Sequence, residues 1–99
     1  MLFDQVNKEL DICIRHLRVL KKVVDEEPIG ILRLAEEIGM PTHKVRYSLR
    51  VLEQQNLIKP SSQGAIAGDK VDEFFKNFDT DLQEIMNRTK SIQELGSSK

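Results

Sequence analysis

The stretch that decides the fold of this chain is PTHKVRYSLRVLEQQNLIKPS, from Pro41 to Ser61. Val45, Leu49 and Leu52 are spaced four and three residues apart, which places them on one face of a predicted helix. The opposite face carries mostly basic and polar side chains: His43, Lys44, Arg46, Tyr47 and Arg50. A helix that buries one stripe and leaves a basic face free can enter the major groove of DNA.

A small β-hairpin is predicted after this helix. Asn56 is the expected left-handed cap, a role that asparagine fills less well than glycine. Residues 57–61 and 65–67 then form two predicted strands around the turn at residues 62–64. Because Pro60 cannot donate a hydrogen bond to a β-ladder, the hairpin should lie at an edge.

A shorter helix is predicted just before the deciding stretch, from Ile31 to Ile38, with Gly30 as its cap and Ile29 in a very short strand. Gly39 is expected to end it in the left-handed conformation. Only residues 39–41 separate the two helices, and so tight a connection is typical of a helix-turn-helix. The predicted core residues of the pair and of the first strand are Ile31, Leu34, Ala35, Ile38, Val45, Leu49, Leu52, Leu57 and Ile58.

Two long amphipathic helices are predicted at the ends of the chain, with apolar residues stepping by three and four over residues 3–24 and 71–92. The first ends before Pro28. The last is expected to run unbroken from Asp69, with a fresh start at residues 79–81 as the alternative. One small core cannot bury both stripes, so we expect a homodimer; the alternative is that the last helix folds back on its own domain. The predicted dimerisation residues are Phe3, Val6, Leu10, Cys13, Leu17, Val71, Phe74, Phe75, Phe78, Leu82, Ile85 and Ile92.

Composition and charge narrow the range of functions that this chain can have. The chain has 99 residues, enough for one domain, and a net charge of −1. That charge is unevenly distributed: residues 41–67 carry +3, whereas the segments before and after each carry −2. Positive charge therefore gathers where DNA contact is predicted. With one cysteine, no apolar run that could cross a membrane and no signal-peptide pattern at the start, a cytoplasmic location is the expectation.

The segment LAEEIGMPTHKVRYSLRVLEQQNLIKPS, residues 34–61, is similar to the pattern LAxxLGLsxxtVsrhLxxLexxGLI of the ArsR, MarR and PadR groups. The chain resembles winged helix-turn-helix transcriptional regulators, above all small archaeal predicted regulators, over Pro28 to Gly68. This implies a mostly α fold, a winged helix-turn-helix with long N- and C-terminal helices forming a dimerisation unit. The expected parts are a long helix at 1–27, the winged helix-turn-helix at 28–68, a C-terminal dimerisation helix at 69–95 and a disordered tail at 96–99.

The resemblance also assigns DNA contacts by position. Arg46 and Arg50 are expected to reach base edges; the alternatives are a solvated basic face, or pairing of Arg50 with Glu53 or Gln54. Tyr47 either touches DNA or covers the helix junction. Two departures from the family pattern are Asn56 in place of its glycine and a wing tip without arginine or lysine. The predicted DNA-binding residues are Thr42, His43, Lys44, Arg46, Tyr47, Arg50, Lys59 and Gln63, with Lys44 and Lys59 on phosphates.

These features predict a sequence-specific double-stranded DNA-binding regulator that acts as a homodimer. The alternative is a winged-helix protein-interaction module without base readout, and a weaker option is a small-molecule sensor with a pocket between the long helices. No enzyme, cofactor or metal is expected. Cys13 and His16 are three residues apart, but two candidate ligands make a weak metal signal, and Cys13 is expected to be buried. Asp79, Asp81 and Glu84 are expected to form an exposed acidic face rather than a cation site.

Overall fold

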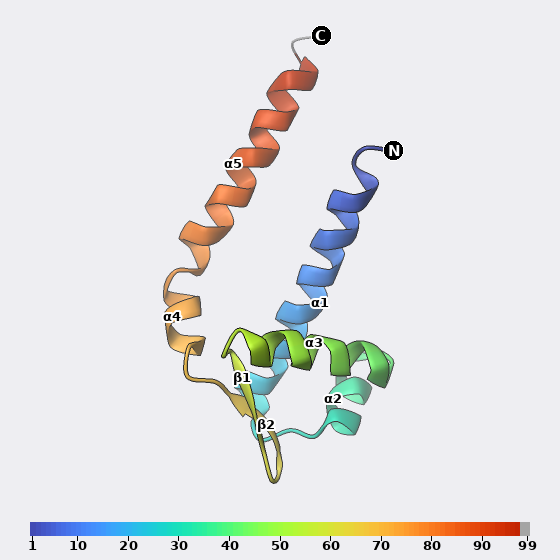
Figure 1. Ribbon diagram of the computed structural model, residues 1–99, viewed down its shortest axis with the longest axis vertical. Coiled ribbons are helices and arrows are strands. Elements are labelled where there is room, and N and C mark those ends of the chain that lie inside the picture. Colours follow the sequence, from blue (N-terminus) through green and yellow to red (C-terminus); the bar gives the residue numbers. More distant parts are fainter. Residues whose placement is uncertain (98–99) are drawn as a thin grey trace.

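The structure, a computed structural model, describes residues 1–97 and is mostly helical with one small antiparallel sheet (Figure 1). This confirms the predicted mostly α class. The elements in chain order are α1 (Asp4–Glu26), α2 (Ile31–Ile38), α3 (Thr42–Gln54), β1 (Ile58–Ser61), β2 (Gly64–Ala67), α4 (Val71–Lys76) and α5 (Phe78–Ser97).

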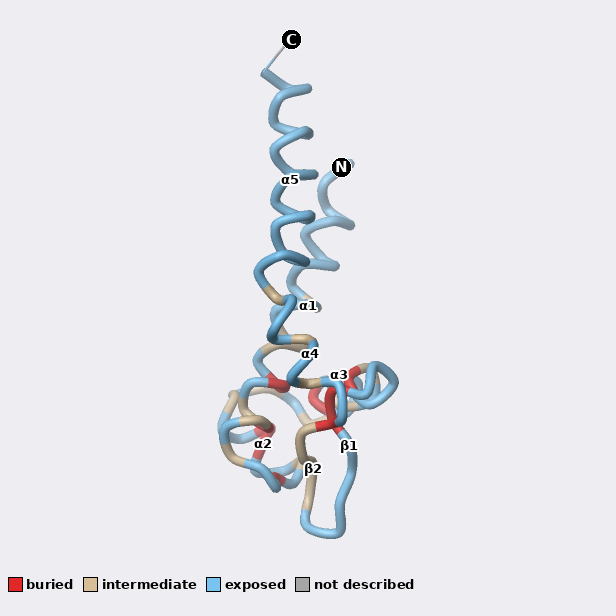
Figure 2. The backbone as a smooth tube through the Cα atoms, turned by 90° about the vertical axis from the view of Figure 1, so that its left-hand side faces the viewer, coloured by how far each residue is buried: buried red, intermediate tan, exposed pale blue. Residues whose placement is uncertain are grey.

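The hydrophobic core lies at one end of the molecule, where the second half of α1 meets α2, α3 and the hairpin (Figures 1 and 2). Ile31, Ile38 and Leu49 pack against it while remaining partly exposed. The other predicted core residues are buried as expected. The buried apolar residues are Val19, Leu20, Val23, Ile29, Leu34, Ala35, Val45, Leu52, Leu57 and Ile58.

The connection between α2 and α3 has the predicted three residues. Gly39 adopts a left-handed φ of 69°, a conformation that costs glycine little because it has no Cβ. Its amide donates to the Glu36 carbonyl at 3.3 Å, and the Met40 amide donates to Ala35 at 3.0 Å. Pro41 precedes the first turn of α3 in an extended conformation and accepts the Lys44 amide at 3.1 Å. The turn therefore fixes the direction of α3 relative to α2.

The hairpin agrees with its prediction to within one residue at the start of each strand. β1 pairs antiparallel with β2, with Ile58 opposite Ala67 and Ser61 opposite Gly64. Ile29 adds a single bridge through two hydrogen bonds with Ala65, of 3.1 and 2.8 Å. The turn into β1 uses the predicted left-handed Asn56, at a φ of 60°.

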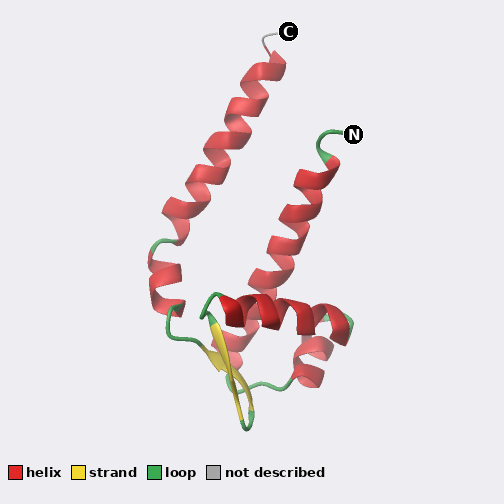
Figure 3. Cartoon of the chain, viewed as in Figure 1, coloured by secondary structure: helices red, strands yellow, loops and turns green. Residues whose placement is uncertain are grey.

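The prediction of one unbroken C-terminal helix is wrong. α4 ends at Lys76 and α5 begins at Phe78, and the chain changes direction between them (Figure 3). Hydrogen bonds from the Asn77 amide to Glu73 and from the Asp81 amide to Asn77 carry the helical pattern across the break. The apolar stripe therefore keeps its phase, which is why periodicity did not reveal the break. Asparagine favours caps over helix interiors, and the acidic residues after it suit a helix start.

The prediction of a disordered tail at residues 96–99 is also partly wrong. Gly96 and Ser97 belong to α5, and residues 98 and 99 lie outside the described part. The Ser97 hydroxyl donates to the Gln93 carbonyl at 2.9 Å, one turn earlier in the helix.

The first half of α1 and the whole of α5 extend away from the core (Figure 2). The described molecule measures 56 × 29 × 20 Å, with a radius of gyration of 16.0 Å. A compact chain of this length has a radius of gyration of about 13 Å. Cys13, predicted to be buried, is exposed, because it lines an open groove in which Phe74 of α4 and Asp81 of α5 lie opposite without covering it. Among the described residues, no helix has both the length and the apolar character needed to cross a membrane.

Candidate nucleic-acid interface

The outer face of α3 is basic and exposed. Val45, Ser48 and Leu52 point into the molecule and are buried, so the opposite side of the helix faces solvent. His43, Lys44, Arg46 and Arg50 are on the exposed part, whereas Thr42 is half-buried. Within residues 1–97 none of these four basic or imidazole side chains forms a hydrogen bond or ion pair.

Arg46 and Arg50 stand one above the other on this face, one helical turn apart. The alternative pairing of Arg50 with Glu53 or Gln54 is not seen in the described part of the chain. Both guanidinium groups are therefore available to an outside ligand. Their spacing suits contact with two neighbouring polar groups along one groove.

Two roles are predicted for Tyr47, contact with DNA and cover of the helix junction, and its contacts within the chain agree with the second. Its ring centroid lies 5.8 Å from that of His16, and the Arg15 guanidinium carbon lies 5.6 Å from the Tyr47 centroid. It therefore covers the junction of α1 and α3. The side chain is still 48% exposed, so part of the ring remains on the outer surface.

Ser48 connects the same two helices from inside. It is fully buried, and its hydroxyl oxygen accepts a hydrogen bond from Arg15 Nε at 3.1 Å. His16 Nδ1 lies 2.8 Å from the same oxygen. Burial, and secondarily the positive charge of Arg15, lower the pKa of His16 below its ordinary value. A neutral imidazole accepts the Ser48 hydroxyl hydrogen at Nδ1, so the serine can serve both partners at once.

Three residues of this site, Ser48, Arg15 and His16, were not among those predicted from the sequence. A signal for Ser48 was present, because a serine three residues after Val45 and four before Leu52 falls on the buried stripe of α3. A buried hydroxyl requires hydrogen-bond partners. The partners come from α1, more than thirty residues earlier, and no local pattern identifies them.

The two hairpin residues predicted to bind DNA lie in different surroundings. Lys59 Nζ forms an ion pair with Asp69 Oδ1 at 3.1 Å, so its charge is partly neutralised. Gln63 is exposed at the tip of the hairpin. The tip is held by Ser61, whose hydroxyl donates to the Gly64 carbonyl at 2.6 Å and accepts the Gln63 amide at 3.2 Å.

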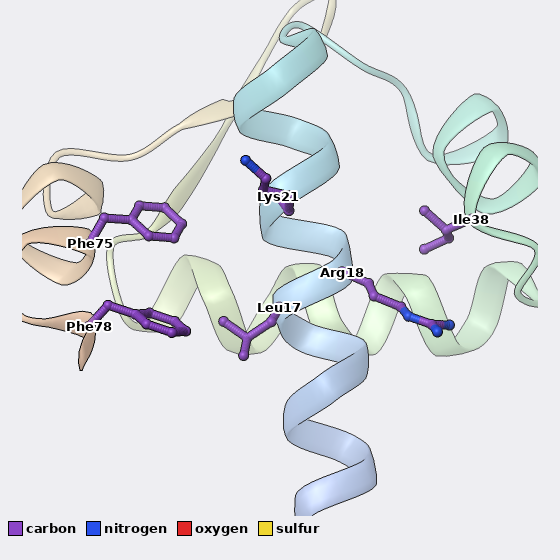
Figure 4. A pocket seen from close by; sticks show the side chains of 6 residues that line it. All are labelled: Leu17, Arg18, Lys21, Ile38, Phe75 and Phe78. Carbon is purple, nitrogen blue, oxygen red and sulfur yellow. The ribbon is translucent and has the colours of Figure 1, made fainter. Parts of the chain in front are cut away.

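The predicted dimerisation residues lie on α1, α4 and α5. Phe74, Phe75 and Phe78 form an aromatic cluster with ring centroids 5.2 to 6.0 Å apart. Phe75 and Phe78 face Leu17 of α1 across an apolar groove of about 540 Å³, with Ile38 on the other side of α1 (Figure 4). Val71, Phe74, Phe78 and Leu17 are half-buried. The predicted residues that remain exposed are Phe3, Val6, Leu10, Cys13, Phe75, Leu82, Ile85 and Ile92.

Comparison with protein-family models gives no match, and no curated protein matches this sequence. Within residues 1–97, no group of three or more histidine, cysteine, aspartate or glutamate side chains is arranged to hold a metal ion. The interpretation of the surface of α3 therefore depends on its residues and their geometry.

Proposed function

We propose that this chain is a winged helix-turn-helix protein that binds specific double-stranded DNA sequences as a homodimer and regulates transcription. The observation that carries the proposal is the outer face of α3, where Arg46 and Arg50 are exposed and unpaired within the described residues. Arginine is the side chain that most often reads guanine in the major groove, which is wide enough for an α-helix. The local charge of +3 over residues 41–67 favours approach to phosphate.

The contacts that hold α3 in place support the same function. Gly39 fixes its start, and Ser48 ties its middle to α1 through two polar contacts. A recognition helix held in this way presents its side chains in one orientation, which lowers the ordering cost of binding. In this proposal Lys44 contacts a phosphate, and Lys59 does so only if it leaves Asp69.

A second copy of the chain is the proposed occupant of the exposed stripes on α1 and α5. No residue of α5 is buried, although most of the stability of a helix in a protein comes from packing its apolar face against other elements. Packing the stripes of two chains together would cover Leu82 and Ile85 and stabilise α5. A two-fold dimer would offer two copies of α3 to major grooves about 34–36 Å apart.

The test is selection from a pool of random duplex DNA, followed by sequencing, at low and near-physiological salt. We expect enrichment of a two-fold symmetric motif with half-sites about one helical turn apart. The double variant Arg46→Glu/Arg50→Glu should lose the motif and all tight binding while keeping its oligomeric state. The matched control is Lys76→Glu/Lys90→Glu, which makes the same change in net charge away from α3 and should enrich the motif normally.

One alternative function is favoured by a specific observation. The Lys59–Asp69 ion pair and the cation-free tip leave the hairpin without the charge that a second DNA contact would use. A winged helix that binds another protein and reads no base would fit such a hairpin. Absence of DNA binding at both salt concentrations would favour this module, and salt-sensitive binding without a motif would indicate an architectural role.

A further inference from the structure

Arg15 of α1 is held beside the outer face of α3 with part of its hydrogen-bonding capacity unused. Its Nε donates to the buried Ser48, and its guanidinium lies near the half-exposed Tyr47 ring. Its two terminal nitrogens have no partner among the described residues. The side chain is therefore fixed by one nitrogen and free to bind an outside acceptor with the other two.

Arg15 lines a surface hollow together with two further cations, Lys8 and Lys44. A hollow of about 610 Å³ is bounded by Lys8 and Arg15 of α1, Lys44 of α3 and the turn at residues 39–41. The one carboxylate at the hollow is Asp11, and neither it nor the two lysine side chains forms an ion pair within residues 1–97. Three cations against one carboxylate leave an uncompensated positive charge, which favours an anionic ligand.

The hollow remains accessible in the proposed dimer. Lys8 and Arg15 are seven residues apart, two turns along one face of α1. At roughly 100° per residue, Lys8 lies about 160° around the helix from Leu10, which belongs to the exposed apolar stripe. A second copy packed on that stripe would therefore leave Lys8 and Arg15 uncovered.

We propose that Lys8, Arg15 and Lys44 form a phosphate clamp that holds the DNA backbone next to the groove entered by α3. This inference depends on the proposed DNA binding and extends it from α3 to α1. An arginine fixed at Nε presents two parallel N–H donors, which suit two oxygens of one phosphate. Backbone contacts of this kind set position and affinity and carry no base information.

The experiment measures binding to a mixed-sequence duplex over a range of salt concentrations. The variants are Lys8→Gln, Arg15→Gln and Lys44→Gln, with Lys90→Gln on α5 as the matched control. Each clamp variant should weaken binding several-fold at low salt and flatten the plot of log Kd against log salt by about 0.9 for each phosphate that is no longer neutralised. The sequence preference found by selection should not change. Asp11→Asn, which removes the opposing charge, should tighten binding.

The outcomes separate this inference from the proposed function. Lys8→Gln and Lys44→Gln break no side-chain hydrogen bond of the described structure, so they test the clamp even if Arg15→Gln fails to fold. If the wild type binds DNA and both lysine variants keep its salt dependence, the clamp is wrong and the regulator remains. If the wild type binds no DNA at any salt, the proposed function fails, and the clamp with it.

Inorganic phosphate, titrated calorimetrically, distinguishes a DNA clamp from a site for free anions. We expect no binding of phosphate alone, because the clamp binds backbone phosphates of a duplex that α3 also contacts. Phosphate binding that disappears in the lysine variants while their DNA affinity stays at the wild-type value would indicate a free-anion site and overturn the clamp.

Discussion

His16 and Ser48 lie 32 positions apart in the chain, yet the imidazole Nδ1 is 2.8 Å from the serine hydroxyl oxygen. This contact joins the long helix α1, whose first half is exposed, to the helix whose outer face is basic. Arg15 Nε shares the same oxygen at 3.1 Å. The buried hydroxyl of Ser48 is therefore a point at which α1 and α3 hold each other.

Replacing Ser48 with alanine should destabilise the fold. The substitution leaves Arg15 Nε and the partly buried His16 Nδ1 without their partner, and a change of this kind costs about 1–2 kcal/mol. Urea unfolding followed by circular dichroism gives the free energy directly. Ser62→Ala is the control, because Ser62 is exposed at the hairpin tip. Equal stability of the two variants would contradict a structural role for the buried hydroxyl.

The stability of the protein should fall as the pH falls through the range in which histidine titrates. The pKa of His16 in the folded state lies below the ordinary value of 6.5, because burial and then Arg15 disfavour the imidazolium. Below pH 6.5 the unfolded chain binds a proton that the folded chain binds less readily, so protons favour unfolding there. His16→Gln should remove part of this dependence. Urea midpoints measured from about pH 7 to 5.5 avoid most carboxyl titration.

His43 provides the control for that measurement. It lies on the exposed face of α3 and forms no side-chain hydrogen bond within the described residues. His43→Gln removes the other histidine of the chain without breaking a side-chain hydrogen bond, so a difference between the two variants in the pH dependence of the urea midpoint is due to the surroundings of His16. If the pH dependence of His16→Gln equals that of the wild type, the lowered pKa of His16 is not its source.

Four charged side chains form a network of ion pairs that joins α2 to α1. Its contribution to the stability of the fold should depend on salt concentration and on pH. Lys22 Nζ lies 2.9 Å from Glu26 Oε2 and 3.4 Å from Glu37 Oε1, and Arg33 contacts both glutamates. Arg33 is the main cause of the lowered pKa of Glu37. Stability from this carboxylate is therefore present above its ordinary pKa of 4.5 and disappears as pH falls through the lower folded value.

In Glu37→Gln, the free energy of unfolding should depend less steeply on pH in acid than it does in the wild type. This difference between the two proteins should be smaller at high salt. The control is Glu36→Gln, because the neighbouring Glu36 is exposed and takes no part in these ion pairs. Acid titrations followed by circular dichroism at two salt concentrations measure both effects. Identical curves for the two variants would show that the network adds nothing to stability.

Local chemistry was enough to predict the turns of this molecule. Gly39 and Asn56 adopt the left-handed conformations expected of them, since each follows an amphipathic helix and can bear a positive φ. The exposed face of α3 also followed from periodicity. Cys13 was placed wrongly because its burial depends on how closely other helices approach α1, and within one chain it stays in an open groove. The break at Asn77 was missed because a one-residue kink leaves the phase of the apolar stripe intact.

The rest of the candidate site depends on how α1 crosses α3. Arg15 and Lys8 appear in the sequence as ordinary charges on a long helix, far from the deciding stretch. Only the crossing brings them next to Lys44. Contacts of this kind are tertiary, so neither spacing nor composition within one segment can predict them.

Introducing charge on α5 should separate the two copies without unfolding either. Leu82 and Ile85 are 41% and 42% exposed, and no residue of α5 contributes to the core, so Leu82→Glu/Ile85→Glu removes no intramolecular packing of consequence. In the proposed dimer the same glutamates would be buried against a second apolar stripe without partners, which is costly. We expect a dimer for the wild type and a monomer of unchanged core stability for the variant.

Sedimentation equilibrium measures the mass of each variant and so decides between the two states. The control is Gln83→Glu/Asn87→Glu, which adds the same charge to a pair that is hydrogen-bonded at 3.0 Å on another face of α5 and should remain dimeric. Dissociation of both variants would mean that added charge alone, rather than its position on the apolar stripe, separates the copies. A wild type that sediments as a monomer at all concentrations would exclude the homodimer, and the exposed stripe would then require a different partner.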